Sequence, residues 1–236
     1  MKTLSFFIFV LLHFICSYSS IQAAEKIKVA CVGNSITYGT GIKNRNTDSY
    51  PAQLQKLLGK KYSVGNFGKP GATLLAHGHH PYIQQEEYQK ALDFAGDIVV
   101  IHLGINDTDP RNWPNYRDEF VHDYLRLIAS FKKVNPQCRI LLAYITPIAD
   151  RHPRFISGTQ QWHEEIQEAI KVVAQITQAE LIDFHTPLYP YPILLPDAIH
   201  PNEEGAHLLA QTAYSAITGD YGGLKLPILY TDYMVL

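Results

Sequence analysis

The sequence predicts an α/β protein in which a central, mainly parallel five-stranded sheet lies between two layers of helices. Two observations support this fold class. Short runs rich in Val, Ile and Leu recur along the chain, and longer segments with helical spacing separate them. Alternating strands and helices of this kind form right-handed crossovers, which place helices on both faces of a parallel sheet.

The expected strands are short and apolar, and they comprise residues 27–32, 62–67, 97–103, 139–145 and 179–184. The third and fourth lack a strict alternation of apolar and polar residues. This pattern is typical of strands that are buried on both faces.

The expected helices comprise residues 50–58, 115–133, 159–178 and 203–217. Ser49 precedes the first of them as a candidate cap, and Pro51 falls in its first turn, where proline is tolerated. The second carries one apolar stripe, formed by Phe120, Tyr124, Leu127, Ile128 and Phe131. Such a stripe predicts an amphipathic helix that packs against the sheet.

Residues 1–24 have the layout of a secretory signal peptide. Lys2 gives a positive start, residues 4–15 are mostly apolar, and small and polar residues follow up to Ala24. The apolar run is shorter than the roughly 20 residues that span a bilayer. We therefore expect export to the periplasm or the extracellular space. A lipoprotein anchored at Cys16 is the alternative, but the residues before Cys16 lack the small side chain that such processing favours.

Residues 25–218 are expected to form one domain. The formal net charge is −2 and both signs are scattered along the chain, so no basic stripe indicates a nucleic-acid partner or a charged membrane surface. Cys31 and Cys138 lie in or beside strand-like runs. Buried free thiols are the commoner explanation, and a disulfide between them is the alternative.

Residues at the carboxyl ends of the strands are the candidates for chemistry, because active sites of such sheets lie there. Residues 33–37 (Gly-Asn-Ser-Ile-Thr) follow the first strand. Gly33 is expected to let the backbone turn sharply and so expose the hydroxyl of Ser35. A serine after a glycine is common in turns, so this motif alone is weak evidence.

Two further strand ends supply candidate hydrogen-bond donors. The backbone amide of Gly71 follows the second strand, and the side chain of Asn106 follows the third. Each has an ordinary explanation as a turn or cap residue. Together they are consistent with an oxyanion hole beside Ser35.

Asp197 and His200 precede the last expected helix, and their spacing of three residues lets a carboxylate reach one ring nitrogen of the histidine. The other ring nitrogen is then available to deprotonate a serine. A capping role explains Asp197 by itself, but it does not explain His200. We therefore expect Ser35, Asp197 and His200 to form a catalytic triad.

These four segments, in this order, resemble the conserved blocks of the SGNH hydrolase superfamily, also called GDSL-type esterases. The resemblance spans roughly residues 26–217. It implies a flavodoxin-like three-layer fold, Ser35 as nucleophile, His200 as base and Asp197 as its partner. It also implies an oxyanion hole formed by the Ser35 amide, the Gly71 amide and the Asn106 side chain. Two positions depart from the family pattern, since Asn34 replaces a frequent Asp and Ile36 a frequent Leu.

The expected activity is hydrolysis of a carboxylic ester, without a metal or an organic cofactor. No long apolar lid segment lies between the strands, so a short acyl group is favoured. Export and aromatic-rich loops favour acetyl esters on carbohydrate.

Tyr38, just after the nucleophile, is a candidate for lining the pocket. Tyr189 and Tyr191 are candidates for stacking on sugars, although aromatic residues are more often core. Residues 77–80 (His-Gly-His-His) are expected to be a polar loop rather than a metal site.

Residues 219–236 form a tail that ends in an apolar run (Tyr-Met-Val-Leu) and resembles the first strand of a sialate O-acetylesterase domain. This tail leads us to expect a truncated or missing C-terminal β-rich domain.

Three functions stay open at this point: a sialate or polysaccharide O-acetylesterase, a lysophospholipase or thioesterase of the same superfamily, and a catalytically silent glycan-binding domain.

Overall fold

The computed structural model describes residues 25–153 and 159–221. The expected signal peptide with Cys16, and residues 222–236 of the tail, lie outside the described residues, so the predictions about them stay predictions. None of the helices within the two described ranges is long and apolar enough to cross a membrane.

The core of the fold is a five-stranded sheet in which every pair of neighbouring strands is parallel, in the order β2-β1-β3-β4-β5. The strands are β1 (Ile27–Gly33), β2 (Tyr62–Gly68), β3 (Ile98–His102), β4 (Arg139–Ala143) and β5 (Glu180–Ile182). Gly33 pairs with Gly68 on one side and with His102 on the other, so the three strands end level with one another.

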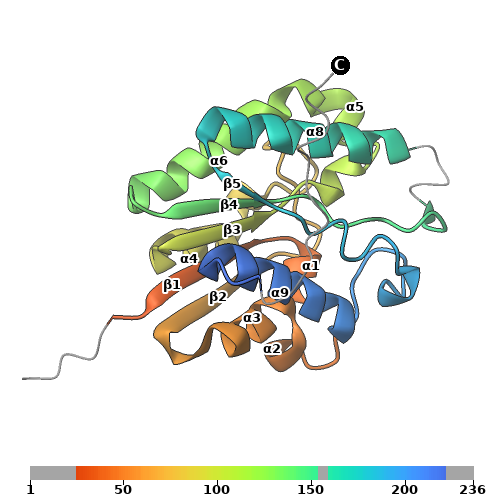
Figure 1. Ribbon diagram of the computed structural model, residues 1–236. Coiled ribbons are helices and arrows are strands. Elements are labelled where there is room, and N and C mark those ends of the chain that lie inside the picture. Colours follow the sequence, from red (N-terminus) through yellow and green to blue (C-terminus); the bar gives the residue numbers. More distant parts are fainter. Residues whose placement is uncertain (1–24, 154–158, 222–236) are drawn as a thin grey trace, which may run out of the picture.

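Helices cover both faces of the sheet (Figure 1), which confirms the expected three-layer architecture. In the view of Figure 1, α6 and α8 lie above the sheet, and α3 and α9 pack together below it. The α-helices are α1 (Ser35–Tyr38), α2 (Arg45–Asp48), α3 (Tyr50–Leu58), α4 (Glu86–Phe94), α5 (Trp113–Tyr116), α6 (Phe120–Val134), α8 (Gln160–Thr177) and α9 (Glu203–Thr218). Short 3₁₀ segments are η1 (Gly59–Lys61), η2 (Tyr82–Gln84), η3 (Ile105–Thr108), η4 (Arg117–Glu119) and η5 (Pro192–Leu194).

The expected helix at 115–133 is divided in the structure. Residues before Phe120 form the short segments α5 and η4, and α6 begins at Phe120. The apolar stripe that predicted the helix lies wholly within α6 and is buried. Periodicity therefore located the packed helix but gave a start that was several residues too early.

Two local expectations were incomplete or wrong. Helix α4 was not predicted, and Ala91 is its only buried residue. Ser49 does precede α3, but its hydroxyl makes no capping hydrogen bond and is buried without a hydrogen-bond partner. Pro51 lies in the first turn of α3 as expected.

The two cysteines in the described part of the chain are buried free thiols, which confirms the expectation for Cys31 and Cys138 over the disulfide alternative. Burial raises the pKa of Cys31 to about 12. A thiol that stays protonated at neutral pH is a poor nucleophile. Cys31 is therefore part of the core of β1 rather than of the chemistry.

Candidate active site

Ser35 is the first residue of α1 and follows β1 after the single residue Asn34; Ser35 is buried, with 7% of its surface exposed. Asn34 fixes this sharp transition from strand to helix. Its side-chain oxygen accepts a hydrogen bond from the backbone N–H of Ile36 at 3.0 Å, and its side-chain nitrogen donates to the carbonyl of His102 at 3.2 Å. Asparagine, with one acceptor and one donor group, satisfies both partners at once.

Gly33 has a different role from the one expected. It lies in β1 and is not among the residues with positive φ, so it does not act by a left-handed turn. A Cβ atom at this position would lie 2.1 Å from Thr37 Oγ1 and 2.8 Å from the carbonyl oxygen of His102. The absence of a side chain therefore lets the first turn of α1 pack directly onto the sheet.

Ser35, His200 and Asp197 form a continuous hydrogen-bonded series. His200 Nε2 lies 2.8 Å from Ser35 Oγ, although the two residues are 165 positions apart in the sequence. His200 Nδ1 lies 2.6 Å from Asp197 Oδ2. With Nδ1 donating its proton to the carboxylate, Nε2 presents a lone pair to the serine hydroxyl. This geometry lets the histidine accept the hydroxyl proton of Ser35.

The carboxylate of Asp197 is held in its charged form. Burial acts to raise its pKa, but hydrogen bonds from the His200 backbone, the His200 ring and the Ile199 backbone outweigh that effect and lower the pKa. The backbone N–H groups of Ile199 and His200 donate to Asp197 Oδ1 at 3.1 and 2.7 Å. A charged carboxylate at this position stabilises the imidazolium that forms when His200 accepts a proton.

Ala198, between these two residues, adopts a left-handed backbone conformation with φ of 75°. Such a conformation costs about 1–2 kcal/mol in a residue with a side chain. Neighbouring backbone groups hold it in place. Ala198 donates to the carbonyl of Leu195 and accepts a hydrogen bond from the backbone N–H of Ala149, both at 2.8 Å. Alanine gives no signal for this conformation, so the sequence could not indicate it.

Gly71 lies on the loop that follows β2, and Asn106 lies in η3, which follows β3 at the same edge of the sheet. Gly71 has φ of 79°, which glycine adopts readily. Asn106 Nδ2 donates to the carbonyl of Ala72 at 3.0 Å, so the two segments are joined beside the predicted oxyanion donors. This bond uses one of the two hydrogens on Nδ2. The Gly71 loop is also joined to β1 by a bond from the Lys69 N–H to the Gly33 carbonyl at 2.9 Å.

Asp107, next to Asn106, is a residue of this site that was not among the residues predicted for it. Its carboxylate is buried and accepts hydrogen bonds from the backbone N–H groups of Leu74 and Leu75, at 2.9 and 2.8 Å. It thereby holds the loop of Gly71 against η3. Burial raises the pKa of Asp107 to about 7, although those hydrogen bonds act in the opposite direction. In the sequence, only the position of Asp107 next to Asn106 pointed to a role in this site, and a turn explains that position equally well.

The other candidates have structural partners. The guanidinium carbon of Arg45 lies 4.0 Å from the centre of the Tyr38 ring. The expected role of Tyr38 in binding substrate stays a prediction. In the histidine-rich loop, His77 Nδ1 lies 2.7 Å from a carboxylate oxygen of Glu119. His79 likewise contacts the side chain of Asn112.

A three-layer domain with a serine, a histidine and an aspartate joined at the carboxyl edge of its sheet has the architecture of the serine hydrolases of the SGNH type. The profile of the GDSL-like Lipase/Acylhydrolase family matches residues 31–208, and the chain belongs to this family. The resemblance stated from the sequence is thus confirmed, and the chain is assigned to the serine carboxylic ester hydrolases.

Among similar proteins, an acetylxylan esterase from Xylanibacter ruminicola is 37% identical over 211 residues, which cover 82% of this chain and 43% of that protein. The chain therefore spans less than half the length of this curated relative. The crystal structure of an acetyl xylan esterase, AlAXEase, has a TM-score of 0.63 at 22% identity and covers 81% of this chain and 100% of its own. A carbohydrate acetylesterase from Sinorhizobium meliloti has a TM-score of 0.61 at 18% identity, covering 82% and 99%. These two structures share the fold.

Proposed function

We propose that this chain is a carbohydrate O-acetylesterase that works through a covalent acetyl-enzyme on Ser35. The observation that supports it most directly is the hydrogen-bonded series from Ser35 Oγ through His200 to Asp197. A serine hydroxyl is a weak nucleophile unless a base removes its proton, and this series supplies the base and the group that orients it.

In the first half of the reaction, Ser35 Oγ attacks the acetyl carbonyl carbon while its proton passes to His200 Nε2. The carbonyl oxygen becomes an oxyanion, and its donors are the backbone amides of Ser35 and Gly71 and the side chain of Asn106. The tetrahedral intermediate then collapses, the C–O bond to the sugar breaks, and the sugar hydroxyl leaves with the proton from His200.

In the second half, a water molecule attacks the acetyl group on Ser35 while His200 accepts a proton from the water. Collapse of this second intermediate returns the proton to Ser35 Oγ and releases acetate. The reaction balances with water as the only co-reactant. No metal or organic cofactor takes part in these steps.

Acetyl groups on a neutral polysaccharide are the favoured substrate, because the relative with 37% identity is an acetylxylan esterase. O-acetylated sialic acid is the second candidate and rests on the resemblance of the tail. A lysophospholipase or thioesterase would prefer longer acyl chains. A silent glycan-binding domain would have no use for the contact between Ser35 and His200. Export, proposed from residues 1–24, would give the enzyme access to extracellular glycans.

Acetate release tests this proposal. The purified chain is incubated with acetylated xylan, O-acetylated sialic acid and p-nitrophenyl esters of increasing acyl length, with Ser35→Ala alongside. We expect the highest kcat/KM on acetyl esters, release of acetate from xylan, and loss of both in the variant. A preference for long acyl chains supports the lipase-like alternative, and glycan binding without turnover supports the silent domain.

A further inference from the structure

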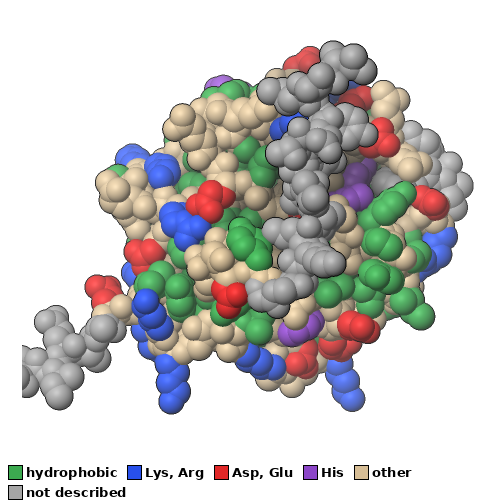
Figure 2. Space-filling view, viewed as in Figure 1, with side chains coloured by type: hydrophobic (Ala, Val, Ile, Leu, Met, Phe, Trp, Pro, Cys, Tyr) green, Lys and Arg blue, Asp and Glu red, His purple; other side chains and the backbone are tan. Residues whose placement is uncertain are grey.

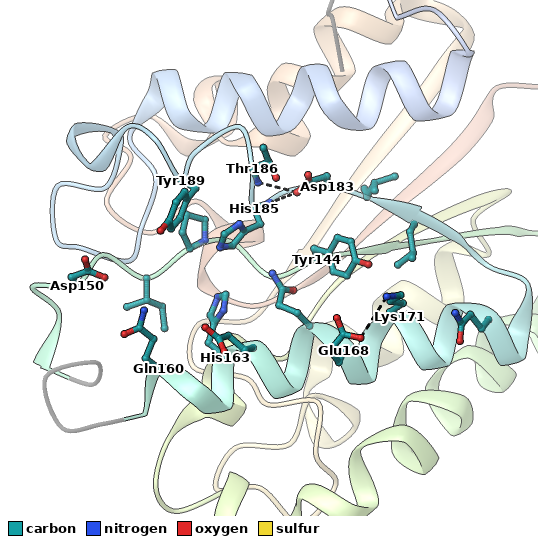
Figure 3. A pocket seen from close by; sticks show the side chains of 17 residues that line it. Tyr144, Asp150, Gln160, His163, Glu168, Lys171, Asp183, His185, Thr186 and Tyr189 are labelled. Carbon is teal, nitrogen blue, oxygen red and sulfur yellow. Dashed lines mark hydrogen bonds and ion pairs between the residues drawn. The ribbon is translucent and has the colours of Figure 1, made fainter. Parts of the chain in front are cut away.

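A groove of about 790 Å³ lies apart from Ser35, between α8 and the segment that follows β5. Figure 3 shows Tyr189 and His185 along one wall and the side chains of α8, among them Gln160 and Lys171, along the other. None of the steps proposed above uses this groove. Its volume is within the range of pockets that bind small molecules, about 300–1,000 Å³.

One wall of the groove is an exposed aromatic surface. Tyr189 is 67% exposed, and its ring stacks on the ring of His185 with centroids 5.2 Å apart and planes inclined by 24°. The backbone N–H of Tyr189 donates to the carbonyl of His185 at 3.0 Å, and Asp183 Oδ1 accepts from the backbone N–H groups of His185 and Thr186. These bonds fix the aromatic surface in position. A large ring that stays in water offers a flat apolar face to a ligand.

Exposed apolar side chains are concentrated beside this wall. Figure 2 shows hydrophobic side chains gathered over the segment between β5 and α9. The exposed large ones in this segment are Tyr189, Tyr191 and Ile193. Contiguous exposed apolar surface on a protein commonly marks a binding site.

The remaining lining is polar and carries more negative than positive charge. Asp150, Glu164, Glu168 and Asp183 face the groove, and Lys171 is the lysine among its lining residues. His185 adds little positive charge, because burial lowers its pKa. Carboxylates and amides bind hydroxyl groups well, whereas a negatively charged ligand would be repelled. The lining therefore favours a neutral polyhydroxylated ligand over sialic acid or uronic acids.

The groove is connected with the candidate active site through the loop after β4. Ile148 and Asp150 line the groove, and Ala149 between them donates its backbone N–H to the carbonyl of Ala198. Ala198 lies between Asp197 and His200. One end of the groove is thus adjacent to the loop that holds the histidine against Ser35.

We infer that this groove binds the backbone of a neutral polysaccharide, with a sugar ring stacked on Tyr189, while an acetylated unit of the same chain lies at Ser35. This inference rests on the proposed function and extends it from the acetyl group to the polymer that carries it. Tyr189 is then a residue that determines specificity for polymeric over small esters.

Tyr189→Ala tests the inference, with Tyr221→Ala as the matched control. Tyr221 is 46% exposed, does not line the groove and lies outside the apolar surface beside it. The measured quantity is the ratio of kcat/KM for acetylated xylan to kcat/KM for p-nitrophenyl acetate. We expect Tyr189→Ala to lower this ratio about tenfold, the scale of one aromatic contact, and Tyr221→Ala to leave it unchanged. Tyr189→Phe keeps the ring and is expected to keep the ratio. An unchanged ratio in Tyr189→Ala overturns the inference.

Calorimetric binding of an unacetylated xylo-oligosaccharide separates this inference from the proposed function, because it needs no turnover. We expect the oligosaccharide to bind the native protein and also Ser35→Ala, and to bind Tyr189→Ala about tenfold more weakly. An oligogalacturonate of the same length is expected not to bind. If Tyr189→Ala binds the xylo-oligosaccharide as tightly as the native protein does, the inferred role of the groove is contradicted. Tighter binding of the anionic oligosaccharide than of the neutral one also contradicts it. A protein that binds xylo-oligosaccharide but releases no acetate contradicts the proposed function and leaves the groove supported.

Discussion

The two halves of the sheet's carboxyl edge differ in how their side chains are held. Around the ends of β1, β2 and β3, Ser35, Asn106 and Asp107 are all buried. The Asn106 side chain donates to the carbonyl of Ala72, and the Asp107 carboxylate accepts from the backbone N–H of Leu74, so the two segments are joined to each other. On the β5 side, Tyr189 and Ile193 are exposed, and backbone turns together with the Asp183 carboxylate of the same segment hold it in place.

This difference separates the two tasks of an esterase. Stabilising an oxyanion requires donors that are fixed before the reaction, and the buried half supplies such a setting. Recognition of an alcohol group needs a surface that can be reached from solvent, which the exposed half offers. His200 joins the two, because its side chain is 19% exposed and contacts Ser35 from the loop of the exposed half.

The largest effect is expected where the halves meet. Ser35→Ala and His200→Ala should each lower kcat on p-nitrophenyl acetate by about 10⁶-fold, because members of a triad act as a unit. The double variant should be no slower than either single one. Steady-state kinetics measures this, with thermal unfolding as the control for folding. If either variant stays near the native rate, that residue has no part in the mechanism.

A smaller loss is expected within the buried half alone. Asn106→Ala should lower kcat by about 10²- to 10³-fold, the scale seen when one oxyanion donor is removed. Asn115→Ala is the matched control, since Asn115 is an exposed residue of α5 whose side chain donates to the carbonyl of Arg111, shortly before that helix. Equal rates for the two variants would show that Asn106 does not act on the oxyanion.

Packing of the buried half is tested by stability rather than rate. Gly33→Ala should lower the free energy of unfolding by about 3 kcal/mol, because the new Cβ meets Thr37 and the sheet backbone. Gly41→Ala is the control, since its φ of 83° costs about 1–2 kcal/mol but its Cβ meets no atom within 4 Å. Urea unfolding measures both. A smaller loss for Gly33→Ala than for Gly41→Ala would contradict the close approach of α1 to the sheet.

The smallest effect is a pH dependence. The folded pKa of Asp107 is raised to about 7, so the folded state holds a proton that the unfolded state releases near its ordinary value of 3.8. The contribution of Asp107 to the free energy of unfolding is therefore greatest below pH 3.8, and it falls as the pH rises to about 7. Burial lowers the pKa of His102 to about 3, which gives the opposite slope below its ordinary value of 6.5. The difference between native protein and Asp107→Asn isolates the carboxyl.

We expect the stability of the native protein relative to Asp107→Asn to decline between about pH 4 and 7 and to be constant above that range. Urea unfolding at a series of pH values measures the difference. A relative stability that rises with pH would mean that Asp107 is charged in the folded protein throughout this range.

Much of the fold was predictable because burial leaves a pattern in the sequence. The strands that lie inside the sheet and the helices α3, α6, α8 and α9 carry apolar residues at regular spacing. Helix α4 was missed because it buries little. The triad residues were predictable as types at strand ends, since proton transfer from a serine needs a base and an orienting acid. The contact between Ser35 and His200, which are 165 positions apart, could be established only from the fold.

Other features leave no such pattern. The carboxylate of Asp107 acts by accepting two backbone hydrogen bonds from a distant loop, and any aspartate in a turn would look the same in the sequence. Ala198 adopts a backbone conformation that alanine does not signal. Tyr189 could be noted as a candidate for stacking on sugars, but its pairing with His185 opposite α8 depends on how β5 lies at the edge of the sheet.

Trapping of the acetyl-enzyme tests the central claim most directly. The native protein is mixed with p-nitrophenyl acetate, quenched in acid within the first turnover, digested and analysed by mass spectrometry. The account predicts a burst of p-nitrophenol and an acetyl group on the peptide that contains Ser35, with neither in Ser35→Ala. Acetyl on another residue, or full turnover by Ser35→Ala, would contradict it.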